Sequence, residues 1–250
     1  LIDFGKINTQ HPHQWAWLDR PLMHRTMLGE EGLRTDGARA TTLIAIGESA
    51  LGLSASAFSS TAFTHEHEEE AGEETAPEIM GSGRAYLFSQ LSDTWSVEIG
   101  GSYLGGTYDS ADALGVNLGS VDGKLRWRPD TYRSFVWVFE AMTSDRDVAS
   151  EDSVSITVSS VKAKGAFTSA QIQLRKRWDF GGFFDWTEDA TIEDAETTAV
   201  GAFFGFNPVE ETARISLVYR HETSDLYDFT DDSVTVQFLW SLGPHKVHTF

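Results

Sequence analysis

Apolar and polar residues alternate along most of the chain in segments of about ten residues, which is the period of a β-strand with one apolar face. In residues 94–105, Trp95, Val97 and Ile99 share one face, whereas Ser96 lies on the other. Such strands are expected at 94–105, 133–141, 166–175, 178–186, 200–206, 213–219 and 234–242, and weaker ones at 36–46, 50–59, 84–91 and 114–127. With an opening stub at 1–8, the pattern predicts about twelve strands and no amphipathic helix.

The connections between these strands alternate between short and long. Short ones fall near 47–49, 92–93, 129–131, 176–177 and 207–209, and long ones at 9–35, 60–82, 107–113, 144–165, 188–196 and 223–232. Tight turns at one end and longer loops at the other are typical of antiparallel outer-membrane barrels. A change of parity near Val121 predicts a β-bulge in residues 114–127.

The apolar face is rich in aromatic residues close to the strand ends. They are Trp95, Tyr103, Trp127, Trp137, Trp178, Trp186, Tyr219 and Trp240. Amphipathic rings suit the level of lipid headgroups, and the opposite face, made of Gly, Ser, Thr, Gln and charged residues, suits a wet lumen. We therefore predict an all-β fold, an antiparallel transmembrane β-barrel formed by residues 1–250 as a single domain. A β-sandwich or a lipocalin-like soluble barrel, which also has one apolar face, is the alternative.

Composition narrows the function classes. Cysteine is absent, which excludes disulfides, thiolate metal sites and covalent haem attachment. Apolar runs such as Phe135 to Phe139 are far shorter than the roughly 18 residues of a membrane helix. The formal charge of −19 excludes a general nucleic-acid-binding surface. The chain starts with Leu1 and carries no signal peptide, so it is expected to be the carboxy-terminal part of a longer protein.

Two segments resemble a known family. One is GKINTQHPHQW at 5–15, followed by DRPL at 19–22 and GEEG at 29–32, and the other is the tail FLWSLGPHKVHTF at 238–250. Both resemble porin-like outer-membrane proteins often labelled zinc-regulated TonB-dependent receptors, although no plug domain is evident. Members are longer at the amino terminus, so the resemblance implies a parent barrel of about sixteen strands. It also implies outer-membrane transport and a link to zinc, and it supplies no ligand residues.

The carboxy terminus carries a candidate assembly signal. Phe250 ends the chain after an alternating strand, and a terminal aromatic residue is what the outer-membrane assembly machinery favours. Pro244 lies between that strand and the end and cannot donate to a ladder.

Histidine and glutamate residues form two candidate metal sites. His65, Glu66, His67 and Glu68 open the acidic external loop at 60–82, and imidazole and carboxylate groups are suitable zinc ligands. A solvated loop that bridges lipopolysaccharide through Ca²⁺ or Mg²⁺ is the alternative.

His11 and His13 lie in the long 9–35 segment, which is expected to fold into the lumen, where they would be ligands or gate residues. Alternatively, this segment simply packs against the wall.

Charged residues with lumen-facing parity form the candidate selectivity site. They are Arg39, Lys124, Arg126, Arg175, Arg214 and Arg220, against Glu98, Glu140 and Asp185. A ring of basic residues favours anions, so we expect mild anion selectivity. Alternatively, these arginines pair with the carboxylates and hold the wall together.

Catalysis has no support in the motifs, since there is no Gly-x-Ser-x-Gly, His-Glu-x-x-His or phosphate-binding glycine loop. The predicted function is passage of small solutes or ions across the bacterial outer membrane. A zinc-uptake component, and a structural sheath or adhesin around a partner protein, are the alternatives. Expected partners are outer-membrane lipid, lipopolysaccharide, the barrel assembly machinery and a second copy of the chain. No resident cofactor is expected.

Overall fold

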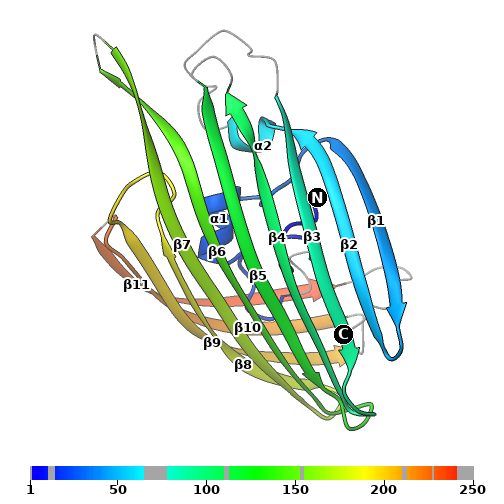
Figure 1. Ribbon diagram of the computed structural model, residues 1–250. Helices are drawn as coiled ribbons and strands as arrows, with labels where there is room; N and C mark the ends of the chain where they lie inside the picture. The colour runs from blue at the N-terminus through cyan, green and yellow to red at the C-terminus, as the bar shows by residue number, and fades with distance from the viewer. Residues whose placement is uncertain are drawn as a thin grey trace.

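The computed structural model describes residues 2–10, 15–64, 78–109, 113–152, 155–209, 213–226 and 228–240. They form one antiparallel sheet of eleven strands in which each strand pairs with its neighbours in the chain, in the order β1 to β11 (Figure 1). The strands are β1 (Gly37–Ile46), β2 (Ser49–Ser59), β3 (Ile79–Gln90), β4 (Trp95–Asp109), β5 (Leu114–Trp127), β6 (Ser134–Asp152), β7 (Ser155–Leu174), β8 (Trp178–Glu188), β9 (Glu196–Val209), β10 (Ala213–Ser224) and β11 (Phe229–Trp240).

The all-β antiparallel fold predicted from the alternation is confirmed. The sheet curls around a hollow, with β1 to β7 on one side and β8 to β11 crossing behind them (Figure 1). It is not closed within the described residues, because β1 pairs only with β2 and β11 only with β10. Eleven of the about twelve predicted strands are present among the described residues. The predicted opening stub is the exception, because residues 2–8 form no strand but lie on the concave side of the sheet.

The predicted bulge at Val121 is wrong. Val121 pairs with Gly101 and Ala141 in an unbroken register. The register of β4 and β5 shifts instead between Thr107 and Asp109. The apolar residues of β5 change from one face of the strand to the other for a different reason. Its concave face begins with the buried apolar residues Val116 and Leu118, and continues with polar ones.

The long connection predicted at 144–165 is also wrong. β6 and β7 continue through it as a paired ribbon, from Arg146 opposite Val161 to Asp152 opposite Ser155. The apolar residues of β7 change parity there, from Ile156 and Val158 to Val161 and Ala163, so the alternation that predicts a strand is interrupted while the ladder goes on. Residues 207–209 belong to β9 rather than to a turn, and residues 210–212 are not described.

Asp130 stabilises the short turn between β5 and β6, at one end of the sheet. Oδ1 of Asp130 accepts the backbone N–H groups of Tyr132 and Arg133, both at 2.8 Å. An aspartate that accepts the amide two residues ahead is typical of a tight turn. These hydrogen bonds, with a further one from the Arg133 guanidinium, lower the pKa of the Asp130 carboxyl. The carboxylate that forms this turn is therefore ionised well below neutral pH.

Two short helices complete the described fold, although the alternation predicted none. They are α1 (Leu22–Leu28) and α2 (Thr61–Thr64). No described helix has the length and apolar character needed to cross a membrane. α1 belongs to the lumenal segment, our name for residues 2–10 and 15–36, which lies inside the curl of the sheet (Figure 1).

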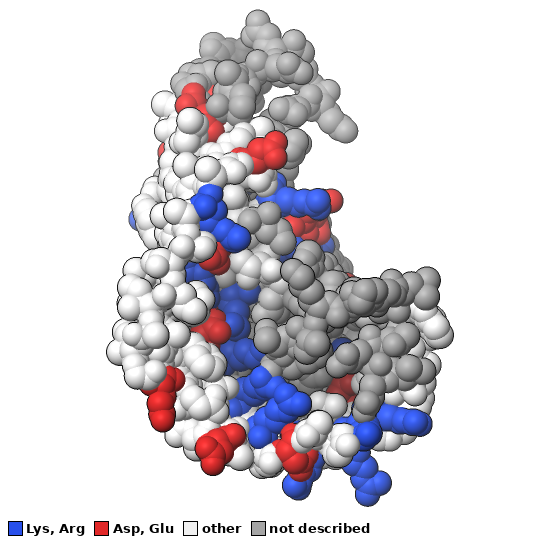
Figure 2. Space-filling view, turned by 90° about the vertical axis from the view of Figure 1, so that its right-hand side faces the viewer, with Lys and Arg blue, Asp and Glu red and all other residues white. Residues whose placement is uncertain are grey.

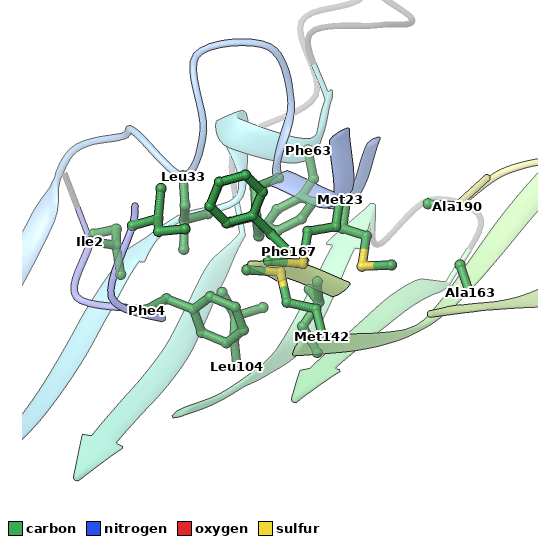
Figure 3. Close-up of a cluster of buried hydrophobic side chains, with 14 of the residues drawn as sticks. Ile2, Phe4, Met23, Leu33, Phe63, Leu104, Met142, Ala163, Phe167 and Ala190 are labelled. Carbon is green, nitrogen blue, oxygen red and sulfur yellow. The ribbon is translucent and has the colours of Figure 1, made fainter. Parts of the chain in front are cut away.

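The principal buried cluster lies between the lumenal segment and the concave face. Phe4, Met23 and Leu33 from the segment meet Leu104 and Phe167 from the strands (Figure 3), and all are at most 2% exposed. Burial of large apolar side chains such as these stabilises by about 1.5–3 kcal/mol each. The chain's own amino-terminal residues therefore pack on the concave face and occupy part of the hollow.

Candidate functional site: the filled lumen

The outer, convex face of the sheet is the apolar one. Large side chains stay exposed there, including Ile99 (58%), Val121 (59%) and Val236 (68%). Soluble proteins rarely expose a continuous apolar surface of this extent. The concave face carries buried charged residues, among them Arg84, Asp122, Glu140 and Asp185.

Aromatic residues form two bands on the convex face. At the short-turn end Trp95 lies opposite Trp127 with ring centroids 6.1 Å apart, and Trp178 lies 4.4 Å from Phe206. At the other end the polar groups of three rings are hydrogen-bonded: Tyr103 to Asn117, Trp186 to Glu196 and Tyr219 to Asp232. Rings with one apolar and one polar edge are typical of a membrane interface.

Glu140 of β6 is the central polar residue of the concave face and is 1% exposed. Its Oε2 accepts the backbone N–H groups of Lys6 and Ile7, each at 3.0 Å. Its Oε1 lies 3.1 Å from Nε2 of His24, which is completely buried in α1. A single wall carboxylate thus holds two separate parts of the lumenal segment.

Asp185 of β8 holds the start of α1. Its Oδ2 accepts the backbone N–H of Leu22 at 2.8 Å, and it is 1% exposed. The first amides of a helix have no partner within the helix, and Pro21 before them offers no side-chain cap. The capping acceptor for α1 therefore comes from the wall of the sheet.

Two glycines let the lumenal segment approach the wall. Gly5 has φ +64°, and a Cβ there would stand 1.9 Å from Oε1 of Glu140. Gly165 of β7 faces α1, where a Cβ would stand 2.4 Å from Cβ of Met23. Both approaches need a residue without a side chain, one on the segment and one on the wall.

Arg84 and Asp122 form a buried ion pair beside Glu140. Two nitrogens of the Arg84 guanidinium bond the two carboxylate oxygens of Asp122 at 2.5 and 2.8 Å. Arg84 also donates to Oγ of Ser102, which in turn accepts the backbone N–H of Gly5. Paired arginine–carboxylate contacts of this kind hold both side chains in one geometry.

The selectivity residues predicted from parity are distributed as follows. Eight lie on strands that line the hollow: Arg39, Lys124, Arg126, Arg214, Arg220, Glu98, Glu140 and Asp185. Arg175 lies instead in the turn after β7, with φ 59° and an exposed side chain. Parity fails there because the strand has ended.

Several of these charges are paired. Arg214 donates to Asp179 at 2.7 Å, Arg220 to Glu222 at 2.6 Å, and Lys6 to Glu98 at 2.5 Å. Across the described part of the chain, neither Lys124 nor Arg126 has an ion-pair partner, and Nε of Arg126 is buried without an acceptor. Figure 2 shows Lys and Arg side chains along the hollow and at the short-turn end of the molecule.

The predicted metal ligands His65, Glu66, His67, Glu68, His11 and His13 lie outside the described residues, as does Phe250. Among the residues that are described, no group of three His, Asp or Glu side chains could hold a metal ion.

Three important wall residues were not predicted. Arg84, Asp122 and Asp179 have the parity of the concave face in their strands, so the alternation contained the signal that would have found them. Lys6 lies outside any strand, and no pattern in the sequence predicts its contact with Glu98.

No family model matches the sequence, and no curated protein matches it. The zinc-linked label of the resembling proteins therefore gains no support. Among solved structures the chain is similar to the CymD monoaromatic hydrocarbon channel, with a TM-score of 0.40 and 11% sequence identity, over 84% of this chain and 73% of that chain.

Proposed function

We propose that this protein is a channel of the bacterial outer membrane that passes small solutes. The observation that carries the proposal is the inverted polarity of the sheet. Large apolar residues point outward on the convex face, and the buried charged residues, such as Glu140 and Arg84, point into the hollow. In a bilayer the outward face meets lipid and the inward face meets water or polar protein.

The distance between the two aromatic bands fits a membrane. Trp95 and Tyr103 are eight positions apart on β4, as are Trp178 and Trp186 on β8. At about 3.4 Å per residue this is roughly 27 Å along the strand, or about 20 Å across a membrane for strands tilted by about 40°. The apolar band of an outer-membrane barrel is about 25 Å tall.

We further propose a mild preference for anions. Lys124 and Arg126 carry charge on the inner wall without a described carboxylate partner, whereas most of the described acidic residues lie at the end with the long loops. Charge at a narrow, partly desolvated constriction outweighs charge on screened loops. Uptake of zinc and a sheath around a partner protein have no specific observation in their favour.

Reconstitution of the full-length protein tests the channel. Purified protein in liposomes should admit small sugars and amino acids in a swelling assay, and a planar bilayer should show unitary conductance steps. Liposomes prepared with heat-unfolded protein are the control. Protein that folds in buffer without detergent, or that inserts without any permeability under all conditions, would contradict the proposal.

A further inference from the structure

The lumenal segment packs on the concave face that would line the path of a solute, so its position decides how much of that path is open. We propose that Glu140 and Asp185 form a latch that keeps the segment in the lumen and favours the closed state of the channel, and that loss of their hydrogen bonds raises the open fraction. The inference rests on the proposed channel function and names the residues that regulate it.

Glu140 joins parts of the segment that are far apart in sequence. It accepts two consecutive backbone amides, Lys6 and Ile7, and also contacts the imidazole of His24. All of these groups are buried or partly buried, so water can replace a lost acceptor only if the segment moves away from the wall. A carboxylate acceptor makes each of these hydrogen bonds stronger than a neutral one would.

Asp185 acts on the same helix from another strand. It accepts the amide of Leu22, two residues before His24, so α1 is held between β6 and β8. Oδ1 of Asp185 is buried and has no hydrogen-bond partner in the described structure. The Leu22 amide is thus the one described group that satisfies this buried carboxylate.

The apolar contacts of the segment do not fix its position by themselves. Phe4, Met23 and Leu33 pack on the wall (Figure 3), but hydrophobic burial is not directional and tolerates small shifts. The polar contacts do define one position, and the close approaches at Gly5 and Gly165 show that wall and segment fit there without spare room. Without the two carboxylates, the backbone amides of Lys6, Ile7 and Leu22 would have no acceptor in this position of the segment. Only this position would therefore lose stability.

The first experiment removes the acceptors. Glu140→Leu and Asp185→Ala should each raise the open fraction of the full-length channel in planar bilayers by about tenfold, the effect expected when a buried donor loses its partner. Asp179→Ala is the matched control. Asp179 is also a buried carboxylate on β8, but its described contacts are to the wall residues Gln171, Asn207 and Arg214.

Gly5→Ala tests the latch without any change to the wall. The added Cβ would meet the Glu140 carboxylate, and φ at this position is unfavourable for alanine. We expect it to open the channel as Glu140→Leu does. This variant leaves every strand intact, so a failure of the barrel to assemble cannot account for the result.

A disulfide should replace the latch reversibly, because the chain contains no cysteine of its own. Asp185→Cys alone should open the channel. Leu22→Cys with Asp185→Cys should close it under oxidising conditions and reopen it with a reductant, while Leu22→Cys alone should remain closed.

The outcomes separate the two proposals. If the unchanged protein is already open and the latch variants conduct no more than it does, the latch is overturned and the channel proposal still stands. A parent and variants that insert but never conduct would overturn the channel itself. Equal opening by Asp179→Ala would show that any loss of a wall carboxylate loosens the barrel, and would also overturn the latch.

Discussion

The ring of Phe183 on β8 lies over Gly201, its direct partner on β9, and occupies the space that a side chain at residue 201 would need. An ideal Cβ on Gly201 would stand 2.4 Å from two atoms of that ring and 2.4 Å from the backbone oxygen of Tyr219. The next pair on the same face repeats the arrangement in reverse, with the ring of Phe203 over Gly181. The phenyl groups lie along the wall, and aromatic residues beside strand glycines are a known means of fixing register.

Gly201→Ala should therefore destabilise the barrel by about 1–3 kcal/mol, as overpacking does. Gly101→Ala is the control, since a Cβ there meets its nearest atom, a backbone oxygen, at an ordinary 3.6 Å. Urea unfolding in detergent micelles measures both. The cost of Gly201→Ala should be smaller in a Phe183→Ala background, because the clash with the ring is gone. Additive costs would show that the two residues do not interact.

The outward position of Trp137 gives a test of lipid contact. This side chain is 40% exposed, and Trp137→Arg would place a charge on the lipid face at a cost of up to about 2–4 kcal/mol, the value at the midplane. Gln171→Arg on the neighbouring strand is the control, because residue 171 already donates to Asp179 on the concave face. Folding titrations in lipid vesicles measure the difference. Equal destabilisation would argue that the convex face does not meet lipid.

Reversal potentials under a salt gradient test the ion selectivity that the inner wall confers. Neutralising Lys124 and Arg126 together as glutamines should shift the reversal potential of the open channel toward cations under a salt gradient. Lys162→Gln should change it little, since Lys162 is exposed near the long-loop end and faces Asp145 at 3.8 Å. Deletion of residues 65–74 should also have a small effect. A large shift on that deletion alone would show that the loops govern transport.

The topology is tested by cysteine labelling in intact cells. Ile192, which is 49% exposed between β8 and β9, should react as cysteine with an impermeant maleimide. Asp130, in the short turn between β5 and β6, should react as cysteine only after the outer membrane is permeabilised. Ser60 would be unsuitable as the external site, because it is completely buried. Labelling of residue 130 alone in intact cells would reverse the orientation.

The sequence by itself determined the strands and the direction of their faces. Residues 114–127 were predicted with the bounds that β5 has, because side chains of a strand alternate between two faces and each face meets a different medium. The same alternation identified Glu98, Glu140 and Asp185 as residues of the concave face. In the ribbon at 147–152 and 155–164, the apolar residues of β7 change parity between Val158 and Val161, so no single alternation runs through it and the prediction was wrong.

Only the tertiary structure decided what these inward charges do. The contacts of Glu140 with Lys6, Ile7 and His24 join residues more than one hundred positions apart. The sheet must curl before the lumenal segment can reach its wall, and no local pattern encodes that approach. The parity change at Val121 has the same origin. Inward residues of β5 are apolar at Leu114, Val116 and Leu118, which join the buried cluster, and polar from Ser120 and Asp122 on, which lie beside Glu140 and Arg84, so the register stays continuous while the hydrophobic pattern changes face.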